Sequence, residues 1–289
     1  MAQSVFLIGA TGHVGKALMA ELAPDHAAGS LRVTVGARSP AARERVAQAG
    51  LAAADFDLDD WQGFDAALAD IDTVFLLRPY TLKQMMMGKQ VIDAARRVRV
   101  RAIVTLGAYG RPDTPWPIIG WNFLVEAYAE RSGLAWTHLR PNYFMDNVLQ
   151  QRDPQTGVIY NRIERPVSWI ASEDIAAVAA AVLRAPQAHV GQAYNLAAEA
   201  ASVTEIAALL TNLTGRPHSV GRTPMEVMMD RLLKQGREPE YARALVDYVD
   251  AVNEGGAPEI ADTFDTVERV TGRPATSWEG FLRRRVDEL

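Results

Sequence analysis

Cysteine is absent from the 289-residue chain. Without a thiol the protein has no disulfide framework, no thiolate nucleophile and no cysteine metal site. Its five histidines are scattered along the sequence and indicate no metal site. The composition therefore excludes three classes of site.

Long apolar runs and an excess of one charge are also missing. No apolar run reaches about 18 residues, the length that a membrane-spanning helix needs. A net charge of −5 and a pI of about 5.6 give no basic footprint for nucleic acid. The first strand-like run begins at residue 4 or 5, which leaves no room for a signal peptide. We therefore expect a cytoplasmic protein that binds neither nucleic acid nor membranes.

Glycine, by contrast, recurs every third residue directly after the apolar run 5–8. The run predicts a buried strand, and residues 16–22 predict a helix. Gly9 would allow the tight turn off the strand, Gly12 would let the backbone approach a phosphate, and Gly15 would let helix and strand pack closely. The helix N-terminus would present N–H groups to a pyrophosphate. The alternative is a glycine-rich turn without a ligand. The cofactor-binding candidates in this loop are Gly9, Thr11, Gly12, His13, Val14 and Gly15.

An acidic residue is missing where NAD-binding versions of this motif carry one. That residue holds the ribose 2′-hydroxyl about 20 positions after the glycines. Here the string 36–39 contains Arg38, and no carboxylate follows until Glu44. Arginine offers a planar fork of donors that suits a 2′-phosphate, so Arg38 favours NADP(H), with NAD(H) as the second cofactor. The alternative is a solvated loop arginine.

Two carboxylates lie where a third short strand, 51–54, ends. The string Asp55-Phe56-Asp57-Leu58 offers an acceptor for the adenine amino group of a nucleotide. A carboxylate here also suits the cap of the helix that starts near Trp61. The two interpretations are equally compatible with the sequence. Asp57 and Leu58 are the cofactor-binding candidates of this segment.

Strand-like and helical stretches alternate through the first half of the chain. Strands are expected at 4–8, 32–36, 51–54, 73–77, 102–106 and 136–139. Helices are expected between them at 12–22, 41–49, 61–68, 81–97 and 121–132. Alternation of this kind implies right-handed crossovers and a Rossmann-type α/β fold with a doubly wound parallel sheet. Ligands on such sheets bind beyond the carboxyl ends of the strands.

Further candidates follow from that rule. Leu77, Arg78 and Pro79 end the fourth strand, and Phe144 follows the sixth. Arg78 suits a phosphate or an anionic substrate; the alternative is a solvated strand-end residue. Phe144 suits a nicotinamide ring as well as an ordinary core.

The rhythm changes after about residue 145. We expect a NAD(P)-binding domain at 1–150 and a smaller, mainly helical substrate lobe at 151–289, over the strand ends and sharing a core with the sheet. Ser202 and Glu205 form a capping box that predicts a helix to residue 213. A short strand is expected at 192–196, and helices at 172–184, 224–233 and 239–253 and in a final segment, 262–289. Large side chains suggest an apolar cleft for a flat ring, walled by Trp116, Trp121, Trp169, Met225, Met228 and Met229.

The Tyr-x-x-x-Lys pair of short-chain dehydrogenases occurs nowhere in the chain. Only four lysines are present, and none follows a tyrosine at the fourth position. This absence argues against ordinary alcohol–ketone chemistry by that mechanism.

At this point the chain resembles a known family, the NmrA-like, atypical short-chain dehydrogenases. The resemblance covers nearly the whole chain, and its most specific parts are the glycine loop and the string Leu-Arg-Pro-x-x-Phe-Met-x-Asn at 139–147. Arg38 and the strings 121–126, 172–176 and 270–274 are also similar. Within the family the chain is most similar to bacterial NAD(P)H-dependent quinone and dye reductases. It is also similar to NmrA regulators, which bind the dinucleotide without turnover.

The chain departs from the family at its catalytic positions. Asn122 occupies the place of the usual helix lysine or histidine, and Ile118 that of the tyrosine. Asn122 can still bond a nicotinamide ribose hydroxyl, but it cannot act as a general acid. Tyr109 is then the first candidate for a proton donor or substrate contact, with Tyr143 beside it; the alternative for Tyr109 is a packing tyrosine with a wet hydroxyl. We take Tyr109, Asn122 and Tyr143 as the catalytic candidates.

The resemblance and the glycine loop together imply an NADPH-dependent oxidoreductase. It would pass hydride to a quinone-like, aromatic or carbonyl small molecule that needs little acid assistance, because solvent can protonate the product. The alternative is an NADP(H)-sensing, NmrA-type regulatory protein without turnover. The expected partner is the small-molecule substrate, and a homodimer is left open.

Overall fold

The computed structural model describes residues 2–285, which form two compact units interleaved along the chain. Unit 1 contains the described residues of Met1–Ala108, Trp121–Arg140 and Ile175–Tyr194; unit 2 contains those of Tyr109–Gly120, Pro141–Asp174 and Asn195–Leu289. The division into domains at residue 150 stays a prediction.

The strands are β1 Gln3–Ile8, β2 Leu31–Ala37, β3 Ala52–Asp55, β4 Thr73–Leu77, β5 Ala102–Leu106, β6 Ala135–Pro141, β7 Tyr143–Phe144, β8 Val158–Asn161, β9 Val167–Ile170, β10 Gln192–Leu196, β11 Glu199–Ala201 and β12 Ser219–Arg222. The α-helices are α1 His13–Ala27, α2 Pro40–Gln48, α3 Phe64–Leu68, α4 Gln84–Arg97, α5 Pro117–Glu130, α6 Met145–Gln151, α7 Ser172–Arg184, α8 Val203–Thr214, α9 Met225–Lys234, α10 Pro239–Glu254, α11 Thr266–Thr271 and α12 Trp278–Arg283. The short 3₁₀ helices within residues 2–285 are η1 Trp61–Gly63, η2 Pro186–His189 and η3 Pro258–Ala261.

A seven-stranded sheet in the order β10-β6-β5-β4-β1-β2-β3 is the centre of unit 1. The pairs from β3 through β1 and β4 to β6 are all parallel. Apolar residues of β1 and β4 lie on both faces of the sheet and are almost fully buried, which is why these strands read as continuous apolar runs.

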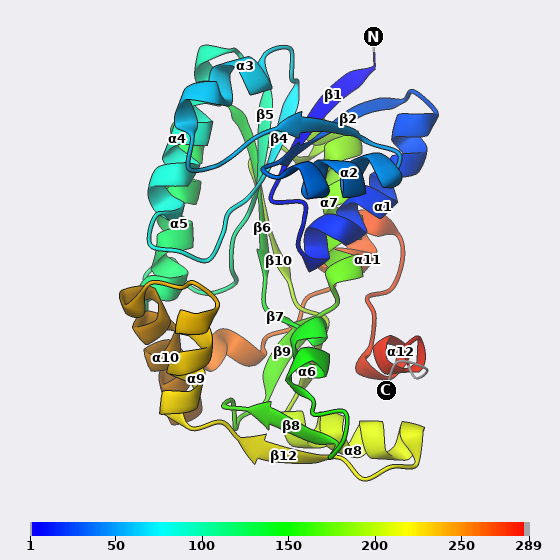
Figure 1. Ribbon diagram of the computed structural model, residues 1–289, viewed down its shortest axis with the longest axis vertical. Helices are drawn as coiled ribbons and strands as arrows, with labels where there is room; N and C mark the ends of the chain where they lie inside the picture. The colour runs from blue at the N-terminus through cyan, green and yellow to red at the C-terminus, as the bar shows by residue number, and fades with distance from the viewer. Residues whose placement is uncertain (1, 286–289) are drawn as a thin grey trace. The chain divides into compact units, whose positions relative to one another are not determined.

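Helices cover both faces of this sheet. Figure 1 shows α4 and α5 on one face and α1 and α7 on the other. One apolar cluster joins β1 and β4 to α4 and α5, with Phe56 and Phe64 stacked at 4.7 Å between ring centroids. The expected Rossmann-like, doubly wound α/β fold is thus confirmed.

Helix ends account for most of the differences in the first half. Helix α1 continues past the predicted end at residue 22, through Pro24 to Ala27, and the N–H of Ala28 still donates to the carbonyl of Pro24. Helix α5 begins four residues earlier than predicted, because Pro117 suits a first helical position. The first strands and helices otherwise lie within a few residues of the expected ranges.

The second half is less helical than predicted. Unit 2 contains a three-stranded sheet in the order β11-β9-β7 and the parallel pair β12–β8. These strands are two to four residues long, too short for an alternating pattern to be recognised in the sequence. The predicted final helical segment is also broken, because Gly272 ends α11 in the left-handed region at a φ of 70°. Its last four residues, 286–289, lie outside the described residues.

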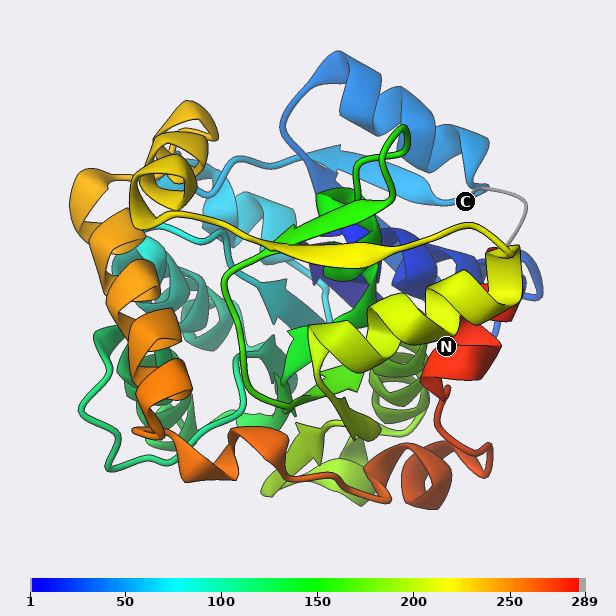
Figure 2. The same cartoon turned by 90° about the horizontal axis from the view of Figure 1, so that it is seen from below.

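Other predictions for unit 2 are confirmed. Ser202 and Glu205 form both bonds of the capping box at α8. Figure 2 shows β8 beside β12, and α9 packed along α10. A small core around Leu232, Ala242 and Val246 holds the two helices together. Within residues 2–285, no helix is long and apolar enough to span a bilayer.

Candidate functional site

The glycine loop after β1 is shaped by backbone geometry. Gly9 has a φ of +79°, and a Cβ there would come within 2.4 Å of the Leu77 carbonyl oxygen. A Cβ on Gly15 would come within 2.2 Å of the Cα of Ala10. Only glycine fits both positions, so the turn is tight and the first turn of α1 lies directly against it.

Gly12 differs from Gly9 and Gly15. A Cβ there would meet no atom within 4 Å, and the residue caps α1 with an ordinary φ of −83°. Helix α1 has no side-chain cap and no acidic residue in its first turn. Thr11, Gly12 and His13 are exposed, whereas Val14 and Gly15 are buried. This open N-terminus, with its positive dipole end, fits a phosphate group.

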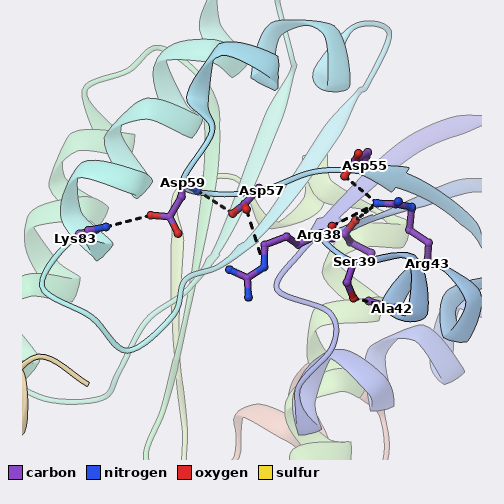
Figure 3. A network of polar contacts seen from close by, with 9 residues as sticks. Arg38, Ser39, Ala42, Arg43, Asp55, Asp57, Asp59 and Lys83 are labelled. Atoms are coloured by element: carbon purple, nitrogen blue, oxygen red, sulfur yellow. Dashed lines mark hydrogen bonds and ion pairs between the residues drawn. The ribbon is translucent and has the colours of Figure 1, made fainter. Parts of the chain in front are cut away.

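Arg38 follows β2, and its side chain points toward Asp57, as Figure 3 shows. Its side chain is 72% exposed, and its Nε lies 3.9 Å from Oδ2 of Asp57. No acidic residue follows β2 directly. The exposed guanidinium is compatible with a 2′-phosphate contact and with a solvated loop residue alike.

A second arginine nearby is held in place. Arg43, in the first turn of α2, donates to Oδ1 of Asp55 at 2.8 Å and to the carbonyl oxygen of Ala37 at 3.2 Å. Ser39 caps the same helix by accepting from the N–H of Ala42. Several hydrogen bonds therefore hold the turn that carries Arg38, while the Arg38 side chain makes only the long contact with Asp57 among the described residues (Figure 3).

The alternative in which Asp55 or Asp57 caps the next helix is wrong. Asp60 caps the 3₁₀ helix at Trp61 by accepting from the N–H of Gln62. Asp57 instead accepts from the N–H of Asp59 at 3.0 Å. Leu58 is half-buried against the core of unit 1. The adenine role of Asp57 and Leu58 stays a prediction.

Arg78 is buried, which overturns the alternative of a solvated strand-end residue. It follows β4, is 6% exposed, and donates from Nη2 to Oδ1 of Asn122 at 3.0 Å. Leu77 before it is half-buried, and Pro79 after it is exposed. The structure thus brings two predicted residues, Arg78 and Asn122, into direct contact.

A buried ion pair lies one turn further along α5. Arg140 of β6 donates through Nε and Nη2 to Oε2 of Glu126, at 2.9 and 2.6 Å. The other oxygen, Oε1, is buried without a hydrogen-bond partner among the described residues and lies against Gly107, where a Cβ would come within 2.7 Å of it. Burial raises the pKa of Glu126 even though Arg140 lowers it. Arg140 and Glu126 therefore tie α5 to the sheet.

Tyr109 lies in unit 2 with its hydroxyl already engaged. The hydroxyl donates to Oδ2 of Asp262 at 2.7 Å, and the ring meets Phe264 edge-on at 5.1 Å. Burial, together with the Asp262 carboxylate, raises the pKa of Tyr109 above its ordinary value. A phenol of this kind stays protonated and is a weak proton donor. The sequence did not indicate Asp262, because the two residues are far apart in the chain.

Tyr143 has the opposite environment. It lies on β7, with its ring 5.6 Å from that of Trp169, and its buried hydroxyl has no hydrogen-bond partner within residues 2–285. Burial raises its pKa well above the ordinary value, and Tyr248 of α10 adds to the shift. Tyr248 was missed in the sequence, since an aromatic at helical spacing usually indicates a core. Phe144, the next residue on β7, is half-buried.

The expected apolar cleft forms only in part. Trp116 and Met229 line a cavity of about 600 Å³ in unit 2, with Pro115, Pro117 and Pro239. Trp169 is 1% exposed, and its indole N–H donates to the carbonyl of Ala201, so it belongs to the core. Met225 and Met228 pack on the small core between α9 and α10. Among the described residues no group of three or more His, Asp or Glu is placed to hold a metal ion.

Residues 9–186 match the family described as NAD(P)H-binding, more than half of the chain. The chain is also 32% identical to an NAD(P)H azoreductase of Xenophilus azovorans, over 96% of each sequence. It belongs to the NAD(P)H-binding family. It is an NAD(P)H-dependent oxidoreductase.

Two solved structures share the fold. The NADPH-dependent quinone oxidoreductase QOR2 of Escherichia coli, in complex with NADPH, has a TM-score of 0.80 at 23% identity and covers 97% of this chain and 99% of its own. The negative transcriptional regulator NmrA, in complex with NADP, has a TM-score of 0.77 at 16% identity and covers 99% of this chain and 96% of its own. The family match begins at residue 9 and therefore includes the glycine loop. In this loop a Cβ on Gly12 would meet no atom within 4 Å.

Proposed function

We propose that this oxidoreductase transfers hydride from NADPH to a quinone-like or aromatic small molecule. The observation that carries the proposal is the open, uncapped N-terminus of α1 at Gly12, followed at the end of β2 by an exposed arginine in place of a carboxylate. The names of the relatives, an azoreductase and a quinone oxidoreductase, favour a flat conjugated acceptor.

The residues of unit 1 suit the successive parts of the cofactor. Backbone N–H groups of Thr11, Gly12 and His13 would hold the pyrophosphate, with Gly9, Val14 and Gly15 shaping the turn. Arg38 would hold the 2′-phosphate. The adenine and nicotinamide halves would contact Asp57, Leu58, Leu77, Arg78, Pro79 and Asn122. Phe144, the remaining candidate for a cofactor contact, belongs to unit 2.

When bound, the reduced nicotinamide supplies a hydride, and the acceptor takes up that hydride with one proton. Asn122 would orient the cofactor, because Arg78 holds its amide in one orientation. Tyr143 would donate a hydrogen bond to a polar atom of the acceptor. Tyr109 would contact the acceptor without giving up its proton, since its pKa is raised and Asp262 already accepts from its hydroxyl. The proton would come from solvent, which suits an acceptor such as a quinone.

A matched pair of glycine variants tests the cofactor site. Gly12→Ala and Gly63→Ala both place a Cβ where no atom lies within 4 Å, so both variants should fold. We expect Gly12→Ala to weaken the binding of NADPH by at least about tenfold, because the added methyl group would meet the phosphate. Gly63→Ala should leave the affinity for NADPH unchanged. Calorimetric titration with NADPH measures the dissociation constant of each variant. Equal affinity in the two variants would contradict the assignment of the loop.

Acceptor-dependent oxidation of NADPH tests the reaction itself. Absorbance is followed with and without a panel of quinones, azo compounds and aromatic carbonyls. Oxidation with at least one acceptor supports the enzyme. Tight binding without oxidation across the panel would favour the alternative, a regulatory protein that binds NADP(H) without turnover.

The cytoplasmic location and the homodimer also stay proposals. Light scattering on the purified chain would measure its oligomeric state.

A further inference from the structure

The side chain of Arg38 is held by a single weak ion pair among the described residues. Its Nε lies 3.9 Å from Oδ2 of Asp57, and 72% of the side chain is exposed. Arg43, only five residues away, makes a close ion pair with Asp55 and also donates to backbone carbonyls. Of the two arginines at this edge, Arg38 is therefore the one that can turn toward a ligand (Figure 3).

Asp57, unlike Arg38, has a side chain that is also bonded to the backbone. Its Oδ1 accepts from the N–H of Asp59 at 3.0 Å, and its side chain is 34% exposed. An Asp side chain bonded to the backbone two residues ahead is fixed in a local turn. When Arg38 leaves Asp57, the carboxylate stays where it is, and its negative charge loses its partner.

We propose that Asp57 is a specificity-determining residue that competes with the 2′-phosphate of NADPH for Arg38. NADPH must take the guanidinium from Asp57 and then sit near an unpaired carboxylate, whereas NADH leaves the ion pair intact. Asp57 thus lowers the preference for NADPH and allows NADH as a second cofactor. This inference rests on the proposed function, in which Arg38 holds the 2′-phosphate.

The expected size of the effect follows from the exposure of the pair. Exposed ion pairs are weak and are screened by salt, so their loss changes an affinity by a few-fold. We expect Asp57→Asn to raise the ratio of the NADH to the NADPH dissociation constant by about three- to tenfold at low salt. The rise should shrink as the salt concentration increases.

Asp57→Asn suits the test because asparagine keeps the side-chain oxygen that accepts from Asp59. Asp57→Ser also keeps an acceptor in this turn and repeats the measurement without an amide. Asp59→Asn is the matched control. It removes the same charge two residues away, from a carboxylate that pairs with Lys83 at 3.3 Å instead of with Arg38.

Calorimetric titration of the full-length chain with NADPH and NADH gives the ratio for each variant. Adenosine 2′,5′-bisphosphate and 5′-AMP serve as smaller probes of the same half of the cofactor. We expect a higher ratio in Asp57→Asn and Asp57→Ser, little change in Asp59→Asn, and no effect of Asp57→Asn once Arg38 is replaced by Ala.

Three outcomes would overturn the proposal. If Asp57→Asn and Asp57→Ser weaken both cofactors equally, Asp57 is an adenine contact only. If Asp59→Asn raises the ratio as much as Asp57→Asn does, the effect comes from the loss of any nearby negative charge and not from the pair with Arg38. If Arg38→Ala lowers the ratio while both Asp57 variants leave it unchanged, only the competition is refuted. A failure of the phosphate role itself is distinguishable, because Arg38→Ala would then leave the ratio unchanged.

Discussion

Arg78 donates from Nη2 to Oδ1 of Asn122 at 3.0 Å, between the end of β4 and helix α5. An arginine has no acceptor, so the bond determines which end of the amide faces it, and the Nδ2 end faces elsewhere. Asn122 is one of the predicted catalytic residues, and this bond makes Arg78 the residue that positions its amide.

Replacing Asn122 tests this relationship. Asn122→Ala removes an acceptor from a buried guanidinium, and we expect it to cost about 1–3 kcal/mol of unfolding free energy. Asn122→Asp keeps an oxygen for Arg78 and should recover most of the stability. Both variants lose the amide donor, so both should lower NADPH turnover. Denaturant unfolding and turnover assays measure the two effects, and a stable Asn122→Ala would refute the structural part.

Gly15→Ala should destabilise the glycine loop itself. Its Cβ would lie 2.2 Å from the Cα of Ala10, and neither backbone can move away without shifting α1 against β1. We expect a loss of about 1–3 kcal/mol of unfolding free energy, the usual cost of overpacking. Thermal and urea unfolding would show this, with Gly12→Ala as the control that should keep the wild-type stability.

Tyr143→Phe should stabilise the chain while impairing its function. The Tyr143 hydroxyl is buried without a partner among residues 2–285, and such a group costs about 1–3 kcal/mol. Removing the oxygen should therefore raise the unfolding free energy, by about 1 kcal/mol. The KM for the acceptor should rise, because a hydrogen bond to it is lost. Tyr109→Phe, which breaks a bond to Asp262, should instead lower stability.

His138 should make stability depend on pH. It is fully buried, its Nδ1 lies 2.7 Å from Oγ1 of Thr105, and burial lowers its pKa to about 3. In the unfolded chain His138 takes up a proton near pH 6.5, whereas in the folded chain it stays neutral until about pH 3. The free energy of unfolding therefore falls as the pH is lowered from about 6.5 toward 3. Within this range the contribution of His138 to the free energy of unfolding changes by up to about 1.4 kcal/mol per pH unit.

The measurement compares wild type with His138→Gln over that range by urea unfolding. The difference in unfolding free energy between the two should change with pH in the direction that disfavours the wild type in acid. Carboxylates far from His138 titrate equally in both proteins and cancel, whereas Glu130, with Oε1 3.6 Å from His138 Nε2, is the one beside the substitution. A difference that stays constant with pH would show that folding does not lower the pKa of His138.

Much of the Rossmann architecture could be predicted because it depends on neighbours in the chain. The buried run of β1, the glycines after it and the capping box of α8 each act over a few residues. The short strands β7, β8, β9, β11 and β12 could not be predicted, because strands of two to four residues depend on partners elsewhere in the chain.

For the site, the sequence by itself determined the residue types: the glycine loop, Arg38 without a following carboxylate, and the absence of any Tyr-x-x-x-Lys pair. Only the tertiary structure decided their environments. In the folded chain Arg38 pairs with Asp57, and Arg78 is buried against Asn122. The Tyr109 hydroxyl donates a hydrogen bond to Asp262. The reason is physical: conformation at a glycine is local, whereas burial, ion pairing and the pKa of a side chain depend on residues that only folding brings together.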